Sequence, residues 1–462
     1  MHFESPTESA VGPGPGPDAG PWYRGLTSYQ WFVFSVAAAA WLFDTMDQQL
    51  FTLARKPAVA ELLKLPQSDP AVASRGGDST AIFMIGWALG GIGFGILGDR
   101  VGRARTLLLT ILLYSLFTGF SALSWGVGSF AAFRFLTGLG VGGVFAVAVS
   151  LVAEVMPDRA RPMALGWLQA LSAVGNMIAA LIGIVLGTVV VGSSWRPMFV
   201  IGILPALLAI PIFLRLKEPE RWKKAALEDA DLPGAKHRLG SLSELFLDPR
   251  WGRNTIVGMI LAFSGVVGLW AIGFFSPDLV RSVFEAHFQR QGLSPAQINS
   301  KLTLWTGINS LLFNFGAFWG IYAFSRITAY TGRKPAFAIS FVLALLATVA
   351  YFWFLAEFWH IFVLTPIMGF CQLAIFGGYA IYFPELFPTR LRSTGTSFCY
   401  NVGRLVASVG PYTLGYLTSR VYAHHPQPGP LRYAGVTMCA VFLLGLLALP
   451  FAPETKGQPL PE

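Results

Sequence analysis

The chain repeats one short charged motif at an interval of half its own length. Residues 154–161 read Glu-Val-Met-Pro-Asp-Arg-Ala-Arg, and residues 385–392 read Glu-Leu-Phe-Pro-Thr-Arg-Leu-Arg. The copies are 231 residues apart in a chain of 462 residues, and each follows a long apolar run. A second pair, Gly102-Arg103 and Gly332-Arg333, keeps nearly the same interval. Self-similarity at a fixed period indicates a repeated architecture. This period is far too long for a solenoid, so the sequence predicts two related halves.

Each half contains six long apolar runs. Hydrophobic residues make up 54% of the chain and charged residues 12%, whereas a soluble domain carries roughly 25% charged residues. A membrane crossing needs about 20 apolar residues, and backbone in lipid must satisfy its own hydrogen bonds, so each run is predicted to be a helix. The prediction is an all-α membrane protein, with twelve transmembrane helices in two pseudo-symmetric six-helix halves around a central cavity. The runs cover residues 29–53, 79–98, 106–125, 129–152, 163–191, 197–216, 253–280, 301–325, 335–356, 358–383, 394–420 and 433–452.

The polar segments between the runs divide the chain. Residues 1–27 are rich in Pro and Gly and are predicted to be a disordered tail. Residues 217–252 form a charged linker between the halves, 28–216 and 253–454, and residues 455–462 form a second tail. Most of the 33 Lys and Arg residues fall on the side of the two tails, so the positive-inside bias places both termini in the cytoplasm. The net charge of +9 therefore reflects topology, and no nucleic-acid partner is expected.

The sequence offers no sign of enzymatic chemistry. Cys371, Cys399 and Cys439 lie inside predicted helices without close spacing or acidic neighbours. This pattern is typical of small packing residues and predicts neither a disulfide nor a metal site. The sequence contains no nucleophile constellation and no phosphate-binding loop, so we expect neither catalysis nor a cofactor. We expect a monomer in the lipid bilayer.

Three motifs resemble those of the major facilitator superfamily. Residues 95–105 (Gly-Ile-Leu-Gly-Asp-Arg-Val-Gly-Arg-Ala-Arg) are similar to its signature between helices 2 and 3, and residues 134–142 to its helix 4 signature. Residues 384–395 resemble the segment after helix 10 in sugar porters, organic-ion transporters and metabolite:proton symporters, among them the sialate and aromatic-acid branches. The resemblance covers residues 28–454 and implies transport by alternating access.

Two features depart from the family pattern. Ala329 stands in the second copy of the loop signature where Asp99 stands in the first, so only the first half has the acidic member of that charge cluster. The Gly-Pro pair that marks antiporters on helix 5 is absent from residues 163–187. The resemblance therefore favours a symporter over a drug-efflux carrier.

Helix 1 carries two acidic residues inside its apolar run. Asp44, Asp47 and Gln48 are at positions i, i+3 and i+4 and share one helix face. Charges inside transmembrane helices are costly and mark ion or substrate pathways. At 1.5 Å per residue, the aspartates lie about 9–14 Å below the outer end of helix 1, and Arg134 lies about 7–8 Å below the same end of helix 4. We therefore expect Asp44 or Asp47 to pair with Arg134.

A buried carboxylate beside an arginine can act as a proton switch, because its affinity for the proton changes when the arginine moves away. The resemblance implies that an acidic residue of helix 1 opposite a helix 4 arginine has this role in proton-coupled relatives. Asp44 best matches that position, and Asp47 is the second candidate. The alternative is that one aspartate only fixes the contact between helices 1 and 4.

A second buried cation, Arg404, lies about 16 Å inside helix 11, near the depth at which transporter sites occur. An arginine in hydrocarbon needs an anionic partner, and the guanidinium suits a carboxylate. We expect Arg404 to bind a substrate carboxylate, with Asn401 and Ser408 on the same face to orient it. The alternative is a salt bridge from Arg404 to Asp44 or Asp47.

Two further sets of residues complete the predicted machinery. Polar residues within the helices are candidates for substrate contact, and otherwise they form hydrogen bonds between helices. Charges at the cytoplasmic helix ends are too near water to bind substrate, and they are predicted to hold that side shut in the outward-open state. The candidate substrate contacts are Gln48, Gln169, Asn176, Asn314 and Gln372. The candidate gating residues are Asp99, Arg100, Arg103, Glu154, Arg159, Arg333, Glu385 and Arg390.

Together these features predict a proton-coupled symporter of a small organic anion in a bacterial inner membrane. The anion would be a monocarboxylate, an aromatic acid or a sialic-acid-like sugar acid. Two alternatives remain at this stage. One is a carrier of sugars or polyols in which Arg404 is structural, and the other is an efflux carrier for organic compounds.

Overall fold

The computed structural model describes residues 21–66, 69–189, 195–230, 238–407 and 409–462, and every regular element in these ranges is helical. The predicted tail up to residue 20, residues 231–237 of the predicted linker and Ser408 lie outside these ranges. The first-half elements are α1 (Ser28–Leu63), α2 (Pro70–Arg100), α3 (Arg103–Ala122), α4 (Val127–Val155), α5 (Arg161–Val189), α6 (Trp195–Ile201), η1 (Leu204–Leu208) and α7 (Ala209–Arg215). Two short helices follow, α8 (Glu220–Ala230) and α9 (Leu242–Leu247). The second-half elements are α10 (Pro249–Val267), η2 (Gly268–Ile272), η3 (Gly273–Phe275), α11 (Ser276–Arg290), α12 (Pro295–Thr331), α13 (Arg333–Phe354), α14 (Phe358–Leu386), η4 (Thr389–Leu391), α15 (Arg392–Ala407), α16 (Gly410–Tyr416), η5 (Leu417–Val421), α17 (Gly429–Met438), α18 (Val441–Ala448) and η6 (Leu449–Phe451).

The predicted all-α membrane fold is confirmed. Each of the twelve apolar runs corresponds to one helix or to consecutive helical segments. Among the described residues, nine segments are long and apolar enough to cross a membrane. The runs that begin with α1, α12 and α15 are not in that set. Two of these three contain the buried charges that the sequence singled out, Asp44 and Asp47 in α1 and Arg404 in α15.

Helix starts follow local capping chemistry. The Thr27 hydroxyl accepts a hydrogen bond from the backbone N–H of Gln30, which begins α1. Asp69 accepts from the N–H of Ala71, and Pro70 follows it at the first position of α2. Both arrangements satisfy donors that the first helical turn leaves free. α1 and α2 therefore extend beyond the apolar runs that predicted them, to Leu63 and from Pro70.

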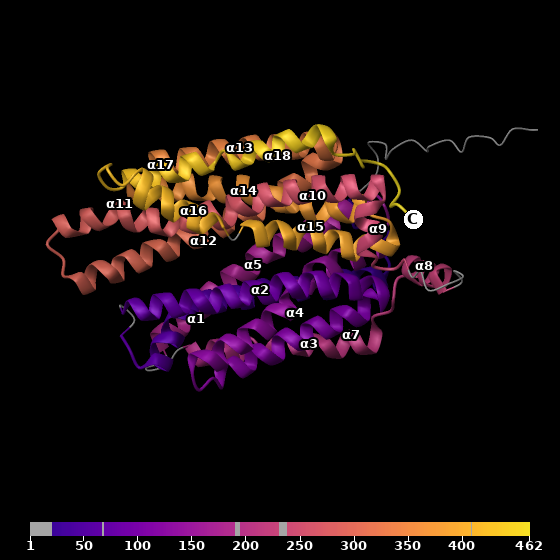
Figure 1. Cartoon of the computed structure of the whole chain (residues 1–462), viewed down its shortest axis with the longest axis horizontal. Coiled ribbons are helices and arrows are strands. Elements are labelled where there is room, and N and C mark those ends of the chain that lie inside the picture. The colour runs from indigo at the N-terminus through magenta and orange to yellow at the C-terminus, as the bar shows by residue number, and fades with distance from the viewer. Residues whose placement is uncertain (1–20, 67–68, 190–194, 231–237, 408) are drawn as a thin grey trace, which may run out of the picture.

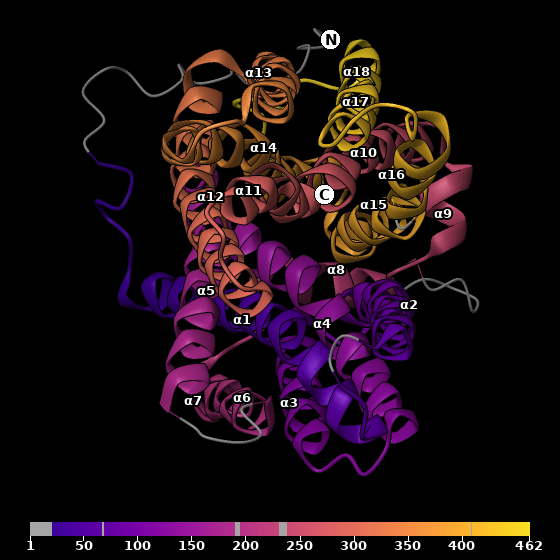
Figure 2. The ribbon, with the colours of Figure 1, turned by 90° about the vertical axis from the view of Figure 1, so that its left-hand side faces the viewer.

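The helices form two groups that face each other. Figure 1 shows α1–α7 in indigo to magenta on one side and α10–α18 in rose to yellow on the other. α8, α9 and the C-terminus lie at one end of the bundle, which we call the linker end; the opposite end is the far end. In Figure 2, which looks onto the far end, α5 lies beside α12 and α2 beside α15, and both pairs are in contact. These two contacts join the halves.

Glycines let helices within each half approach closely. A Cβ at Gly142 of α4 would overlap the carbonyl oxygen of Trp87 in α2. A Cβ at Gly320 of α12 would overlap the carbonyl oxygen of Phe370 in α14. Small residues at helix crossings allow this packing in membranes. Because α2 and α4 occupy the same places in the first half as α12 and α14 in the second, the repeat seen in the motifs extends to the packing.

One run of the second half is interrupted inside the bundle. α10 passes through the π-helical turn η2 and the 3₁₀ turn η3 into α11. At this break, a Cβ on Gly273 would lie 2.5 Å from Oε1 of Gln372. Irregular backbone at membrane depth is tolerated where it is buried in protein or lines a cavity. The ring centre of Trp270 in η2 lies 5.8 Å from the guanidinium carbon of Arg404, which makes this region the first place to look for a site.

Candidate functional site

The two aspartates of α1 are fully buried. Asp44 accepts a hydrogen bond of 2.9 Å from Nε2 of Gln48, one turn further along the helix. Its second oxygen, Oδ1, has no hydrogen-bond partner among the described residues, and neither has either oxygen of Asp47. Buried carboxylates normally have their oxygens satisfied, so this pair differs from ordinary structural acids.

Asp47, and not Asp44, lies beside Arg134. Nη1 of Arg134 is 3.8 Å from Oδ2 of Asp47, and both side chains are fully buried. Arg134 is held mainly by neutral groups, because it donates to Oγ of Ser121 at 2.8 and 3.0 Å and to Oγ1 of Thr137 at 2.9 Å. Its guanidinium also lies 4.6 Å from the ring centre of Phe199. The cation therefore stays in place whether or not Asp47 is charged.

Arg404 lies among aromatic rings contributed by both halves. Its guanidinium carbon is 3.7 Å from the ring centre of Trp87 in α2, 4.6 Å from that of Tyr400 and 5.8 Å from that of Trp270. Arg404 is buried, and its Nε and Nη1 have no hydrogen-bond partner among the described residues. Asp44 of the opposite half lies within electrostatic range, yet the described residues contain no ion pair of 4.0 Å or less between the two.

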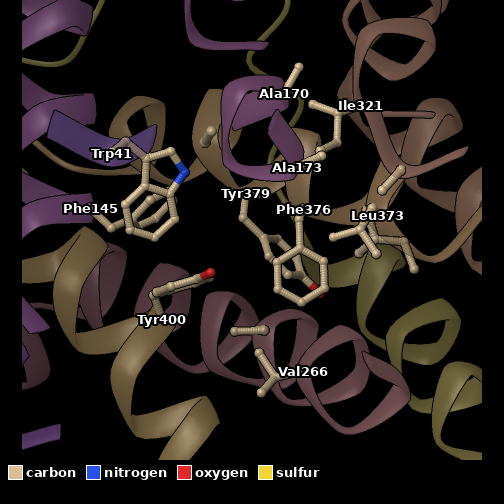
Figure 3. Packing of buried hydrophobic residues seen from close by; sticks show 14 of the residues in the cluster. Trp41, Phe145, Ala170, Ala173, Val266, Ile321, Leu373, Phe376, Tyr379 and Tyr400 are labelled. Atoms are coloured by element: carbon tan, nitrogen blue, oxygen red, sulfur yellow. The ribbon is translucent and has the colours of Figure 1, made fainter. Parts of the chain in front are cut away.

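Stacked rings join the halves next to Arg404. Phe145 of α4 packs on Tyr400 of α15 with ring centres 4.3 Å apart, and Trp41 of α1 packs on Phe145 at 5.0 Å. Figure 3 shows these three rings together, with Phe376 and Tyr379 of α14 beside them. Aromatic faces attract a guanidinium and pack against flat apolar groups. The surroundings of Arg404 therefore suit an anion whose remainder is planar or apolar.

The other predicted substrate contacts are spread through the bundle. Oε1 of Gln169 accepts from Nε1 of Trp41 at 3.1 Å, and Nε2 of Gln372 donates to Oγ1 of Thr348 at 2.8 Å. Each of these hydrogen bonds stays within one half. The remaining two contacts join the halves: Nδ2 of Asn176 donates to Oδ1 of Asn314 at 3.0 Å, and Asn401 of α15 faces Gly91 of α2.

The duplicated motif builds the same ion pair in both halves, at the linker end. Arg103 donates from Nη2 to Oε1 of Glu154 at 2.9 Å and also lies 3.0 Å from Asp99. Arg333 donates from Nη2 to Oε1 of Glu385 at 2.8 Å. All five side chains are buried. The second half has Ala329 in place of the second carboxylate, so its cluster carries one acid and the first carries two.

Several hydrogen bonds cross between the halves at this cluster. Nη1 of Arg392 donates to Oε1 of Glu154 at 2.8 Å, and Nη2 of Arg103 donates to the carbonyl oxygen of Thr389 at 2.6 Å. Asp99 accepts from the N–H groups of Ser393 and Thr394, at 3.2 and 2.8 Å, at the start of α15. A carboxylate at a helix N-terminus satisfies free donors and interacts favourably with the helix dipole. We call Asp99, Arg103, Glu154 and Arg392 the inter-half cluster.

The other predicted gating residues contact the segments around the bundle. Arg390 donates from Nη2 to Oε1 of Glu244 of α9 at 2.6 Å, and Arg100 donates to the carbonyl oxygen of Leu239 at 3.2 Å. Arg159 donates to the carbonyl oxygen of Arg24. Arg392 was not among the predicted gating residues, although its place at the end of the repeated motif could have identified it.

A second repeated contact caps the helix that follows each loop signature. Glu218 accepts from the N–H groups of Ala104 and Arg105, both at 3.1 Å. Glu454 accepts from the N–H groups of Arg333 and Lys334, at 2.9 and 3.0 Å. Burial would raise the pKa of Glu454, but these N–H groups, that of Lys456 and the charge of Arg333 together lower it below its ordinary value. Sequence reasoning missed both caps, since a lone glutamate after an apolar run carries no distinctive pattern.

The described residues hold no cluster of His, Cys, Asp and Glu that could bind a metal ion. The three cysteines are buried and free. A bundle of two related six-helix halves, with buried charges of both signs near its middle, defines a secondary transporter. The chain belongs to the Major Facilitator Superfamily, which matches residues 26–298.

Known proteins support this assignment. The chain is 28% identical to a probable 4-methylmuconolactone transporter of Cupriavidus pinatubonensis, over 94% of this chain and 93% of that protein. It is 27% identical to a cis,cis-muconate transport protein of Acinetobacter baylyi, over 81% of this chain and 84% of that protein. Its fold is similar to that of the proton:xylose symporter XylE of Escherichia coli, with a TM-score of 0.71 and 18% identity over 94% of this chain and 98% of that one. At that identity the likeness shows the fold alone.

Proposed function

We propose that the protein is a proton-coupled symporter of a small organic acid with a planar, unsaturated or aromatic body. The observation that carries this proposal is the state of Arg404, which is buried between Trp87 and Tyr400 with two free N–H positions. A guanidinium in this setting is prepared to bind a carboxylate, and the flanking rings are suited to a flat body. The names of the two curated relatives, a muconolactone transporter and a muconate transporter, fit the same class of cargo.

The electrostatic interaction between Asp44 and Arg404 supports proton coupling. While Asp44 is ionised, its charge interacts with Arg404 across the two halves. Protonation of Asp44 removes that competitor, so the substrate carboxylate takes its place at Arg404. One proton moves with one carboxylate, and the cycle is electroneutral. It avoids the roughly 2.3 kcal/mol per charge that each 100 mV of membrane potential would otherwise impose.

Alternating access requires that the two ends of the bundle open in turn. The inter-half cluster holds the linker end closed, because Glu154 and Arg392 belong to opposite halves. When this cluster separates, substrate and proton leave through the linker end. The positive-inside distribution of Lys and Arg supports a cytoplasmic position for that end, and an inward proton gradient would then carry the substrate inward with the proton.

Uptake into proteoliposomes tests the proposal. The panel is cis,cis-muconate, 4-hydroxybenzoate, nicotinate, sialic acid, lactate and glucose, each with and without an inward proton gradient. We expect gradient-driven accumulation of at least one planar acid, and loss of accumulation in Asp44→Asn with exchange at equal pH retained. Accumulation of no acid, or glucose equilibration without dependence on the gradient, would overturn the proposal and favour a sugar-type facilitator.

A further inference from the structure

One buried hydroxyl group next to the proposed proton site has no assigned role. Tyr114 of α3 is fully buried, and its hydroxyl makes no hydrogen bond of normal geometry among the described residues, although the neighbouring Ser115 hydroxyl interacts with it. It lies within electrostatic range of both Asp44 and Asp47. A buried polar group without a partner costs roughly 1–3 kcal/mol. If the hydroxyl never had an acceptor, phenylalanine would fill this position without that cost in stability. The hydroxyl is therefore expected to have an acceptor in some state of the protein.

The free carboxylate oxygens are acceptors within electrostatic range of the Tyr114 hydroxyl. Oδ1 of Asp44 and both oxygens of Asp47 lack partners among the described residues, whereas Tyr114 supplies one donor. α3 also contacts Asp47 one turn after Tyr114. A Cβ at Gly202 would lie 3.0 Å from Oδ1 of Asp47 and would overlap Cγ2 of Thr118, so both side chains meet at Gly202. Asp47 is therefore confined against the face of α3 that carries Tyr114.

Each carboxylate has its own cation. Asp47 lies 3.8 Å from Arg134, which Ser121 and Thr137 hold in place. Asp44 faces Arg404 across the halves, and Arg404 is held by stacked rings. Other polar side chains near the pair are Gln48 on α1, which is bonded to Asp44, Thr118 on α3, which interacts with Asp47, and Tyr400 on α15, which lies in the field of Asp44. The pair thus connects a cation within the first half to a cation in the second.

We propose that Tyr114 makes Asp44 and Asp47 a single shared protonation site. Two neighbouring carboxylates in a medium of low dielectric constant do not both ionise readily, so the pair holds one proton and one negative charge. Tyr114 donates its hydrogen bond to whichever aspartate is ionised. The proton changes place by a relay: the carboxyl group of one aspartate gives its proton to the Tyr114 oxygen, while the Tyr114 hydroxyl gives its own proton to the other carboxylate, and the tyrosine stays neutral.

The consequence for transport rests on the proposed proton coupling. When the shared proton lies on Asp44 and the negative charge on Asp47, Arg404 has no competitor and Arg134 has a counter-ion. The proton that the pair holds in this state is the one that moves with the substrate. Arg404 is then free for the substrate carboxylate. Tyr114 is a positioning residue in this scheme, since it touches neither the substrate nor Arg404.

Infrared titration of the purified full-length protein in nanodiscs tests the shared site without substrate or gradient. The carboxylic C=O stretching band is followed against pH in Asp44→Asn and in Asp47→Asn, each with and without Tyr114→Phe, and the double variant Asp44→Asn/Asp47→Asn supplies the baseline. A hydrogen bond to an ionised carboxylate favours the charged form. Tyr114→Phe is therefore expected to move the midpoint to higher pH by about one unit in both backgrounds. A shift in one background only, or in neither, would overturn the proposal.

Tyr351→Phe serves as the matched control. Tyr351 is also fully buried, but it lies in the second half and its hydroxyl donates to Oδ1 of Asn309 at 2.9 Å. We expect this variant to change thermal stability without moving the carboxyl midpoint. The measurement separates the two proposals, because equal shifts in both backgrounds together with no proton-driven uptake would reject the transport function and leave the shared site intact.

Discussion

Glu154 of the first half and Arg392 of the second half form an ion pair of 2.8 Å in which neither side chain has exposed surface. The same oxygen, Oε1, also accepts from Arg103 at 2.9 Å. One carboxylate therefore neutralises two guanidinium groups, and Asp99 supplies the second negative charge. The equivalent acid of the second half, Glu385, has its close partners in Arg333 of its own half and Thr455 of the C-terminal tail. The repeated motif thus joins the halves through the glutamate of its first copy and the last arginine of its second copy.

Glu154→Gln should loosen the contact between the halves. Removing one partner of a buried ion pair costs about 3–5 kcal/mol, and here the loss leaves two arginines without their shared counter-ion. We expect a lower thermal unfolding midpoint and faster amide exchange over residues 389–396. Glu385→Gln is the control, because its ion pair lies inside the second half. It should destabilise the protein without raising exchange in that segment, and equal exchange in the two variants would contradict the asymmetry.

Asp99→Ala should fray the start of α15 specifically. Asp99 accepts the N–H groups of Ser393 and Thr394 from the opposite half, and loss of such a cap costs about 0.5–2 kcal/mol. Exchange of these two amides should rise by roughly 2- to 30-fold. Glu218→Gln is a suitable comparison, since it weakens the cap at Ala104 and Arg105 within the first half. Unchanged exchange at Thr394 in Asp99→Ala would rule out the cap.

Glu454 should make the stability of the linker end depend on pH in the acidic range. Its pKa is lowered in the folded protein by the N–H groups of Arg333, Lys334 and Lys456. A lowered pKa contributes stability that is present above the unfolded value and lost as pH falls through the folded value. Glu454→Gln should therefore reduce the unfolding midpoint at neutral pH, and the difference from wild type should shrink on acidification below about pH 4.5. A difference that is constant with pH would show that its ionisation plays no part.

The sequence was sufficient to predict the fold. Membrane helices can be recognised from the length and composition of their apolar runs, and the internal repeat identified two halves. The sequence also predicted the depth at which the buried charges lie, because depth along a helix follows from residue number. It did not identify which aspartate lies beside Arg134. That choice depends on how α1 is rotated against α4, and Asp44 and Asp47 share a face at nearly the same depth.

The sequence also did not predict that aromatic rings surround Arg404 or that the hydroxyl of Tyr114 lies near the aspartates. Most aromatic residues of a membrane protein face lipid or the interface, and Trp87 looks like any other tryptophan in an apolar run. Only the packing of α2 against α15 brings it to Arg404. Functional residues that act across two halves are hardest to recognise in one sequence, because no spacing relates them.

The stacking on Trp87 predicts that Arg404 needs both its charge and its shape. Arg404→Lys keeps the charge but loses the planar group that lies 3.7 Å from the Trp87 ring centre. We expect it to abolish proton-driven uptake of cis,cis-muconate.

Trp87→Leu removes a cation–π contact worth roughly 0.5–2 kcal/mol, so the KM for uptake should rise by about 2- to 30-fold. Trp87→Phe keeps an aromatic face, and its KM should stay closer to that of the wild type. Phe133, whose ring packs on Phe117 and Phe120 in the first half, provides the control, because Phe133→Leu removes a ring of similar size away from Arg404. If Trp87→Leu and Phe133→Leu raise KM equally, the ring at position 87 supports the helix and not the arginine.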